Sequence, residues 1–262
     1  MNLLQNILAH KRGEVDFKKQ AAPIELLRER PGYQHAPISL AAALQRRSFA
    51  VIAEAKKASP SRGVIREVYD PAAIARAYEQ CGAAAVSVLT DSRYFHGTLN
   101  DLMTVREASS LPILRKDFIL DSYQLAEAKS AGADAILLIA AALAPNQLAE
   151  LQEEARTLGL ECLVEIHNED ELQTALESGA TVIGVNNRDL TTFETDIGTS
   201  VRLAPLVTDR ICVSESGISS QGDIAALRGA GIRAVLVGEA FMRAANPGDE
   251  LAKFLSMAEG PS

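Results

Sequence analysis

The sequence KSAGADAILLI, residues 129–139, joins the end of one expected helix to the start of one expected strand. Gly132 stands where a helix C-terminus needs a left-handed residue, which glycine adopts without a Cβ clash. The apolar run at 135–139 is short and uninterrupted, as in a parallel strand that is buried on both faces. This stretch therefore predicts a helix that leads directly into a buried strand.

The same helix-glycine-strand pattern recurs at Gly82, Gly179 and Gly231, so the four glycines lie 50, 47 and 52 residues apart. Four further short apolar runs lie among these segments, at residues 49–55, 113–116, 161–166 and 211–214. Each interval then holds two βα units of about 25 residues, the size of a parallel strand with its crossover helix. Eight such units predict a single (β/α)8 TIM barrel.

A doubly wound open sheet is the alternative fold. It would normally carry a Gly-x-Gly-x-x-Gly turn after its first strand, whereas this chain has KKASPSRG at residues 56–63. We expect one domain over residues 1–262, in which residues 1–47 form a helical extension that caps the barrel.

Composition excludes several classes of partner. The 262 residues are 47% hydrophobic and carry a formal charge of −8, which argues against binding nucleic acid or anionic lipid, since both require a basic surface. No apolar run is long enough to span a membrane and no signal segment begins the chain, so we expect a cytoplasmic protein. Cys81, Cys162 and Cys212 are odd in number and far apart, which suits free thiols and predicts no metal site.

Charged residues stand at the ends of the expected strands. Side chains alternate along a strand, so Glu54 and Lys56 share one face of the first, and the same rule places Lys116 and Glu165 on the inner faces of the third and fifth. Glu215 stands at the end of the seventh expected strand. Charges that point into a barrel are costly unless they are paired, and C-terminal strand ends are where barrels of this kind keep active sites. We interpret the set as acid/base groups; a purely structural ion network is the alternative.

Two small turns follow the last two strands. Ser216 and Gly217 follow the seventh, and Gly238 and Glu239 follow the eighth. Their backbone N–H groups can bind a phosphate, which this fold often holds at that position. Because a carboxylate repels phosphate, we expect Glu239 to contribute only its N–H and to direct its side chain toward solvent or the helix dipole.

Apolar residues at or just beyond strand ends could line a slot for a flat aromatic ring. They are Phe95, Phe118, Leu137 and Leu190. Core packing explains each of them equally well. His167 lies on the same face as Glu165 and is expected to support it rather than to catalyse.

Six motifs, in order along nearly the whole chain, resemble those of the indole-3-glycerol-phosphate synthase family. They are IAEAKKASPS (52–61), SVLTD (87–91), RKDFI (115–119), LVEIH (163–167), GVNNRDL (184–190) and SESGI (214–218). The resemblance implies that 1-(2-carboxyphenylamino)-1-deoxyribulose 5-phosphate is converted to indoleglycerol phosphate, carbon dioxide and water in tryptophan biosynthesis. It implies no cofactor and no metal.

The resemblance also implies roles for individual residues. Lys116 would be the general acid at ring closure, and Glu165 would remove a proton at dehydration. Glu54 would orient Lys116, and Lys56 would bind the substrate carboxylate. The remaining residues would hold the anthranilate end (Asn186, Arg188), complete the polar wall (Glu215, Ser216), bind the phosphate (Ser59, Gly217, Gly238, Glu239) and enclose the ring (Phe95, Phe118, Leu137, Leu190).

The segment from Lys57 to Asp70 is the longest expected βα loop, and we expect it to close over the phosphate as a lid. Two rival functions remain open: another sugar-phosphate barrel enzyme, such as an aldolase that forms a Schiff base at Lys116 or an Amadori-type isomerase, and a sugar-phosphate-binding regulator without turnover. The small-molecule substrate is the expected partner of a monomer, with possible association with pathway neighbours.

Overall fold

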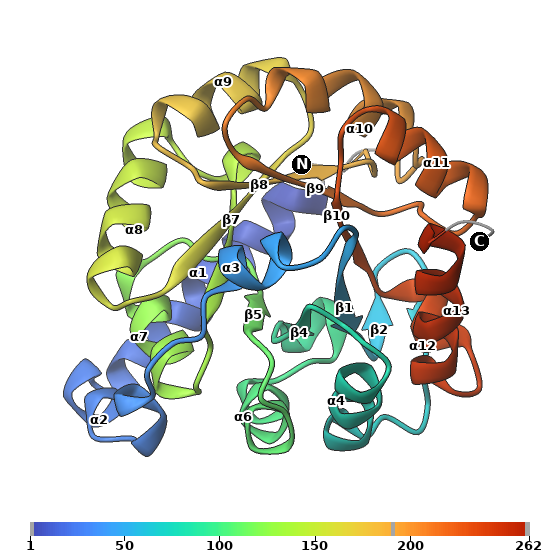
Figure 1. Cartoon of the computed structure of the whole chain (residues 1–262). Coiled ribbons are helices and arrows are strands. Elements are labelled where there is room, and N and C mark those ends of the chain that lie inside the picture. The colour runs from blue at the N-terminus through green and yellow to red at the C-terminus, as the bar shows by residue number, and fades with distance from the viewer. Residues whose placement is uncertain (1–2, 190–191, 260–262) are drawn as a thin grey trace.

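The fold is a closed barrel of parallel strands surrounded by helices (Figure 1), and the computed structural model describes residues 3–189 and 192–259. The barrel strands are β1 (Ala50–Ala55), β4 (Ala85–Leu89), β5 (Ile113–Lys116), β6 (Ala135–Ile139), β7 (Glu161–Ile166), β8 (Val182–Asn186), β9 (Ile211–Glu215) and β10 (Ala234–Val237). Strand β1 pairs in parallel with both β4 and β10, which closes the sheet and excludes the open-sheet alternative. The predicted (β/α)8 fold is confirmed.

Helices precede, connect and follow the strands. They are α1 (Leu3–Ala21), α2 (Ile24–Arg28), η1 (Pro31–Gln34), α3 (Leu40–Gln45), α4 (Pro71–Gln80), α5 (Ser92–Phe95), α6 (Leu99–Ala108), α7 (Ser122–Ser130), η2 (Ala140–Ala142), α8 (Pro145–Thr157), α9 (Glu169–Glu177), α10 (Gly198–Leu203), η3 (Ala204–Leu206), α11 (Gln221–Gly229), α12 (Glu239–Arg243) and α13 (Pro247–Glu259). Asp70, Asn168 and Ser220 begin α4, α9 and α11 by accepting hydrogen bonds from free N–H groups.

The glycines of the repeat end their helices as predicted. Their φ angles are 94° at Gly82, 84° at Gly132, 83° at Gly179 and 86° at Gly231, all in the left-handed region. Gly159, between α8 and β7, has a φ of 77° and is a fifth member that the sequence repeat did not include.

The alternation along β1 separates two hydrophobic clusters. Ile52 packs inside the barrel with the inward residues of the other strands, whereas Val51 and Ala53 belong to the larger cluster between strands and helices. Glu54 is buried and lines the cavity at the C-terminal end of the barrel. The face predicted for Glu54 is therefore the inward one, as expected.

The N-terminal segment contacts both ends of the barrel. Leu40 and Leu44 of α3 join the interior cluster near the starts of the strands, and α3 lies in front of them in Figure 1. Leu3 and Ile7 of α1 line the cavity at the opposite, C-terminal end.

A buried ion cluster attaches α1 to the strand ends. Lys11 Nζ lies 2.8 Å from Asp91 Oδ2 and 2.9 Å from Asp117 Oδ1, and the lysine side chain is only 1% exposed. Arg115 pairs with the other oxygen of Asp117 at 3.0 Å. Because Lys116 stands between Arg115 and Asp117, this cluster also fixes the backbone that carries Lys116.

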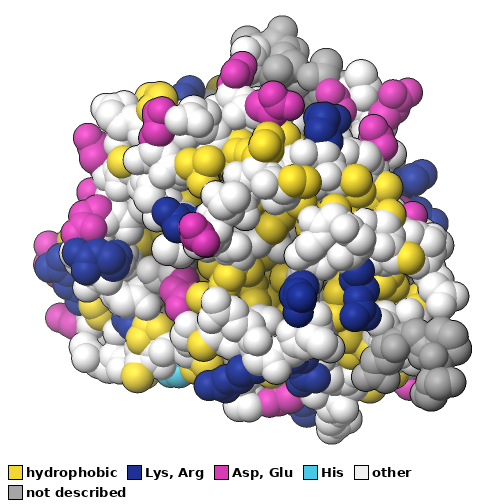
Figure 2. All heavy atoms as spheres, turned by 45° about the horizontal axis from the view of Figure 1, so that its top comes forward, with side chains coloured by type: hydrophobic (Ala, Val, Ile, Leu, Met, Phe, Trp, Pro, Cys, Tyr) yellow, Lys and Arg dark blue, Asp and Glu magenta, His cyan; other side chains and the backbone are white. Residues whose placement is uncertain are grey.

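Basic and acidic side chains are interspersed over the face of the molecule in Figure 2. Within residues 3–189 and 192–259, no helix is long and apolar enough to cross a membrane. All three cysteines are free.

Candidate active site

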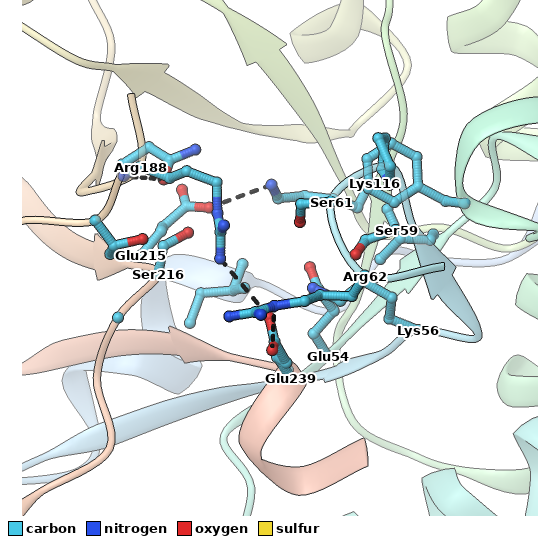
Figure 3. Close-up of a pocket in the computed structure, with 18 of the residues that line it drawn as sticks. Glu54, Lys56, Ser59, Ser61, Arg62, Lys116, Arg188, Glu215, Ser216 and Glu239 are labelled. Atoms are coloured by element: carbon cyan, nitrogen blue, oxygen red, sulfur yellow. Dashed lines mark hydrogen bonds and ion pairs between the residues drawn. The ribbon is translucent and has the colours of Figure 1, made fainter. Parts of the chain in front are cut away.

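A cavity of about 470 Å³ opens at the C-terminal ends of the strands (Figure 3). Fifteen residues predicted for the site line it: Glu54, Lys56, Ser59, Phe95, Lys116, Phe118, Leu137, Glu165, Asn186, Arg188, Glu215, Ser216, Gly217, Gly238 and Glu239. The sixteenth, Leu190, lies outside the residues that the structure describes. Cavities of this volume accept small-molecule ligands.

Lys116 is the centre of the charged group. Its Nζ lies 3.1 Å from Glu165 Oε2 and 3.2 Å from Glu215 Oε2, so one ammonium joins the ends of β5, β7 and β9. Burial by itself lowers the pKa of Lys116, but the carboxylates of Glu165, Glu215 and Glu54 outweigh it and raise that pKa well above its ordinary value. The surrounding carboxylates therefore favour the ammonium form of Lys116.

Glu54 pairs with its neighbour on the strand face. Its Oε1 lies 2.6 Å from Lys56 Nζ, so the shortest ion pair of Glu54 is with Lys56 and not with Lys116, which it influences only through the longer-range field. Gly238 faces this carboxylate: a Cβ at position 238 would lie 2.8 Å from the Cβ of Glu54, closer than real side chains approach. Glycine at 238 therefore makes room for Glu54, a role that the sequence did not reveal.

Glu215 depends on a second glycine. A Cβ at Gly184 of β8 would overlap Glu215 Oε1 and lie 3.3 Å from Glu215 Cδ. The carboxyl group is 1% exposed and occupies the space that a side chain at 184 would take. The bare strand at Gly184 is thus what allows Glu215 to reach Lys116.

The expected phosphate end combines small residues with strained backbone. Ser216 and Gly217 both have positive φ, 69° and 75°, and a Cβ at 217 would overlap the methyl group of Thr195. Among the residues that the structure describes, the buried Oγ of Ser59 has no hydrogen-bond partner. An unsatisfied buried hydroxyl that faces a cavity is suited to a ligand.

Glu239 corrects one expectation. Its carboxylate was expected to point to solvent or to the helix dipole, but it lies 3.2 Å from Arg62 Nε, 3.0 Å from Arg243 Nη2 and 3.7 Å from Arg188 Nη2. Figure 3 shows Arg62 and Arg188 directed toward it. The expectation was wrong because three cations surround one carboxylate, which leaves this end of the cavity positive despite the acidic residue.

Arg62 comes from the long loop between β1 and α4, which contains the two-stranded hairpin β2 (Ala58–Ser59) and β3 (Gly63–Val64). Its ion pair with Glu239 joins this loop to the start of α12. The sequence analysis did not predict Arg62 or Arg243 for the site, since only the folded barrel brings both arginines to Glu239.

The apolar part of the cavity lies near the ends of β4 and β5. The ring centroids of Phe95 and Phe118 are 6.2 Å apart with planes tilted by 39°. Leu137 is buried beside them at the cavity wall. Phe193, Leu3 and Ile7 also line the cavity and were not predicted.

His167 adjoins the charged group. Its Nε2 lies 3.6 Å from Glu165 Oε1, and its Nδ1 lies 3.0 Å from Glu171 Oε2. Within the described residues, no group of three or more His, Cys, Asp or Glu side chains is arranged to hold a metal ion.

A closed barrel with a buried lysine-carboxylate group and a positive, glycine-lined end defines a (β/α)8-barrel enzyme with an acid/base site for an anionic small molecule. Solved structures match the fold: thiamine phosphate pyrophosphorylase from Pyrococcus furiosus (TM-score 0.63, 14% identity, 82% of this chain and 98% of that one) and a 3-hexulose-6-phosphate synthase (TM-score 0.63, 15% identity, 80% and 99%).

The sequence comparisons identify the family, whereas the structural ones match only the fold. The family profile described as indole-3-glycerol phosphate synthase matches residues 4–254. The indole-3-glycerol phosphate synthase of Salinibacter ruber (strain DSM 13855 / M31) is 48% identical over 265 residues, which cover 99% of this chain and 97% of that protein. The chain belongs to the indole-3-glycerol phosphate synthase family, a family of carboxy-lyases of tryptophan biosynthesis.

Proposed function

We propose that the cavity of Figure 3 converts 1-(2-carboxyphenylamino)-1-deoxyribulose 5-phosphate to indoleglycerol phosphate. The ring carbon attacks the substrate carbonyl, the ring carboxylate leaves as carbon dioxide, and water is lost to form the indole. Each stage requires proton transfer to or from oxygen or carbon, which the charged strand ends can supply.

Lys116 is the general acid of ring closure. Its ammonium donates a proton to the carbonyl oxygen as negative charge develops there, and its position between Glu165 and Glu215 keeps it charged beforehand. Glu165 removes the proton at dehydration. Lys56, paired with Glu54, binds the carboxylate of the substrate ring, with Asn186 and Arg188 nearby.

The two ends of the substrate are assigned from the two ends of the cavity. The phosphate lies against Ser59, Gly217, Gly238 and the N–H of Glu239, where Arg62 and Arg243 add positive charge. The aromatic ring lies between the apolar side chains of Phe95, Phe118 and Leu137. Loop 57–70 closes over the phosphate end as a lid.

The observation that carries this assignment is the buried contact of Lys116 with two carboxyl groups. A Schiff-base aldolase needs a neutral lysine as nucleophile, whereas the carboxylates around Lys116 raise its pKa even though burial alone would lower it. A charged lysine suits proton donation. The family membership independently favours the synthase reaction over an aldolase or a binding regulator.

Product fluorescence tests the proposal directly, since the protein contains no tryptophan and new indole emission must come from product. Lys116→Met should lower turnover at least ~100-fold with the fold intact. Lys253→Met removes a lysine that is 72% exposed and should match the wild type. Absence of indole emission from the wild type with authentic substrate, or a substrate adduct trapped on Lys116 by borohydride, would overturn the proposal.

A further inference from the structure

Two buried carboxyl groups share one lysine in the site. Glu165 and Glu215 contact Lys116 Nζ at nearly equal distances, 3.1 and 3.2 Å, and are 3% and 1% exposed. The other nearby lysine, Lys56, is paired with Glu54 at 2.6 Å. Two ionised carboxylates beside one ammonium leave an uncompensated buried charge, so a second cation or a bound proton must balance one of them.

The second oxygen of each carboxyl group has a different environment. Glu165 Oε1 faces His167 Nε2 at 3.6 Å, and the side chain of Asn186 also hydrogen-bonds to this carboxylate. Glu215 Oε1 is buried, has no hydrogen-bond partner within residues 3–189 and 192–259, and lies against the bare backbone of Gly184. The first site favours a charge and the second disfavours it.

Glu171 fixes the orientation of His167. Its Oε2 accepts a hydrogen bond from the backbone N–H of His167 at 2.8 Å and lies 3.0 Å from the ring Nδ1. Asn168, which begins α9, donates to the other oxygen of Glu171 at 2.8 Å. The ring is therefore held with Nδ1 toward Glu171 and Nε2 toward Glu165.

The charged groups around His167 favour its protonated form. Glu171 faces it from α9, Glu165 from β7 and Glu215 from β9, and all are acidic. Burial by itself lowers the pKa of His167, but these carboxylates raise it above its ordinary value. His167 can therefore act as a second cation, but it also pairs with Glu171, so one carboxyl group of the set still needs a proton. Of the two carboxyl groups on Lys116, Glu165 is the one in contact with His167.

We propose that His167, oriented by Glu171, is a positioning residue that keeps Glu165 ionised, whereas Glu215 is the carboxyl group of the pair that carries a proton. The assignment rests on the proposed function and refines it: Glu165 is ready to accept a proton, and the hydroxyl of Glu215 can donate to the substrate. Burial alone raises the pKa of both groups. At Glu165, Lys116 and His167 outweigh burial and lower the pKa below its ordinary value. At Glu215, Lys116 also lowers the pKa, but burial and the negative charges of Glu165 and Glu54 outweigh it, and the pKa of Glu215 rises to about 7.

The histidine ring can be observed without turnover. The chain has four histidines, so the ring signals of His167 in a ¹H–¹³C NMR spectrum are assigned by their loss in His167→Asn. We expect His167 to titrate above its ordinary pKa of 6.5. Glu165→Gln and Glu171→Gln should each lower that midpoint, whereas Glu215→Gln should lower it less, since His167 is in contact with Glu165 and Glu171 and Glu215 acts on it only at longer range.

Turnover supplies a second readout. His167→Asn removes the cation beside Glu165, so the acidic limb of the kcat/KM profile should move up by about one pH unit, with kcat/KM up to about tenfold lower on that limb and nearly unchanged at pH 8. His35→Asn is the matched control, because His35 pairs with Asp134 at 3.2 Å outside the cavity and its loss should leave the profile unchanged.

Equal effects of Glu165→Gln and Glu215→Gln on the His167 midpoint would overturn the proposal, as would a His167→Asn profile that superimposes on the wild type. The NMR titration needs no substrate. If the wild type formed no indole product, the proposed function would fail, while the NMR titration would still decide the unequal protonation of the two carboxyl groups.

Discussion

A single methyl group at position 184 should separate Glu215 from Lys116. In Gly184→Ala the new Cβ would overlap Glu215 Oε1 and lie 3.3 Å from both Glu215 Cδ and Leu163 Cδ1. The carboxyl group must then move by roughly 1 Å, and a misplacement of that size in a catalytic group can lower turnover about 100-fold. Because the displaced group is the end of a side chain, the free energy of unfolding should fall by only about 1 to 3 kcal/mol.

Indole fluorescence gives kcat and KM for this variant, and urea unfolding gives its stability. Gly229→Ala is the matched control: residue 229 ends α11 with no atom near its missing Cβ, so turnover should be unchanged and stability equal or up to about 1 kcal/mol higher. A folded Gly184→Ala enzyme with kcat close to that of the wild type would refute the reasoning that Glu215 acts at its observed position.

Three further perturbations test the surrounding structure. Lys11→Met leaves Asp91 and Asp117 buried without their lysine and should lower the free energy of unfolding by about 3 to 5 kcal/mol in urea unfolding. Burial raises the pKa of Asp117, but Arg115 and Lys11 outweigh it and lower that pKa below its ordinary value of 3.8. Ionised Asp117 therefore stabilises the fold fully above pH 3.8, and this stabilisation is lost as the pH falls through the lowered pKa. Asp117→Asn should accordingly weaken the dependence of the free energy of unfolding on pH in the acid range. Arg62→Ala should raise KM more than it lowers kcat, which initial rates at varied substrate concentration would show. A variant with the KM of the wild type would contradict this prediction.

Much of the fold follows from local pattern. A glycine ends each helix of the repeat because only a left-handed residue continues the chain there, and the φ of 84° at Gly132 matches that reasoning. Alternation along β1 and β5 is equally local, so the cavity-facing positions of Glu54 and Lys116 could be predicted without knowing any neighbour. The bounds of β5 and β7 agree with the predicted runs at both ends.

The pairing of the site residues could not be read in the same way. Glu54 was expected to act on Lys116, but its shortest ion pair is with Lys56, and the contacts of Lys116 are with Glu165 and Glu215 from two other strands. Glu239 was misjudged for the same reason, since its cationic neighbours come from separate loops.

The sequence alone determined that this chain forms a barrel, that its charged residues collect at one end, and that its motifs are those of one family. Periodicity and turn chemistry act between residues near one another in the chain, so they can be recognised from the sequence alone. Only the tertiary structure decided which carboxyl group meets which cation, and that glycines 184 and 238 make room for Glu215 and Glu54. Ion pairs near 3 Å and van der Waals overlaps depend on the register of the closed barrel, where strands far apart in sequence bring their ends together.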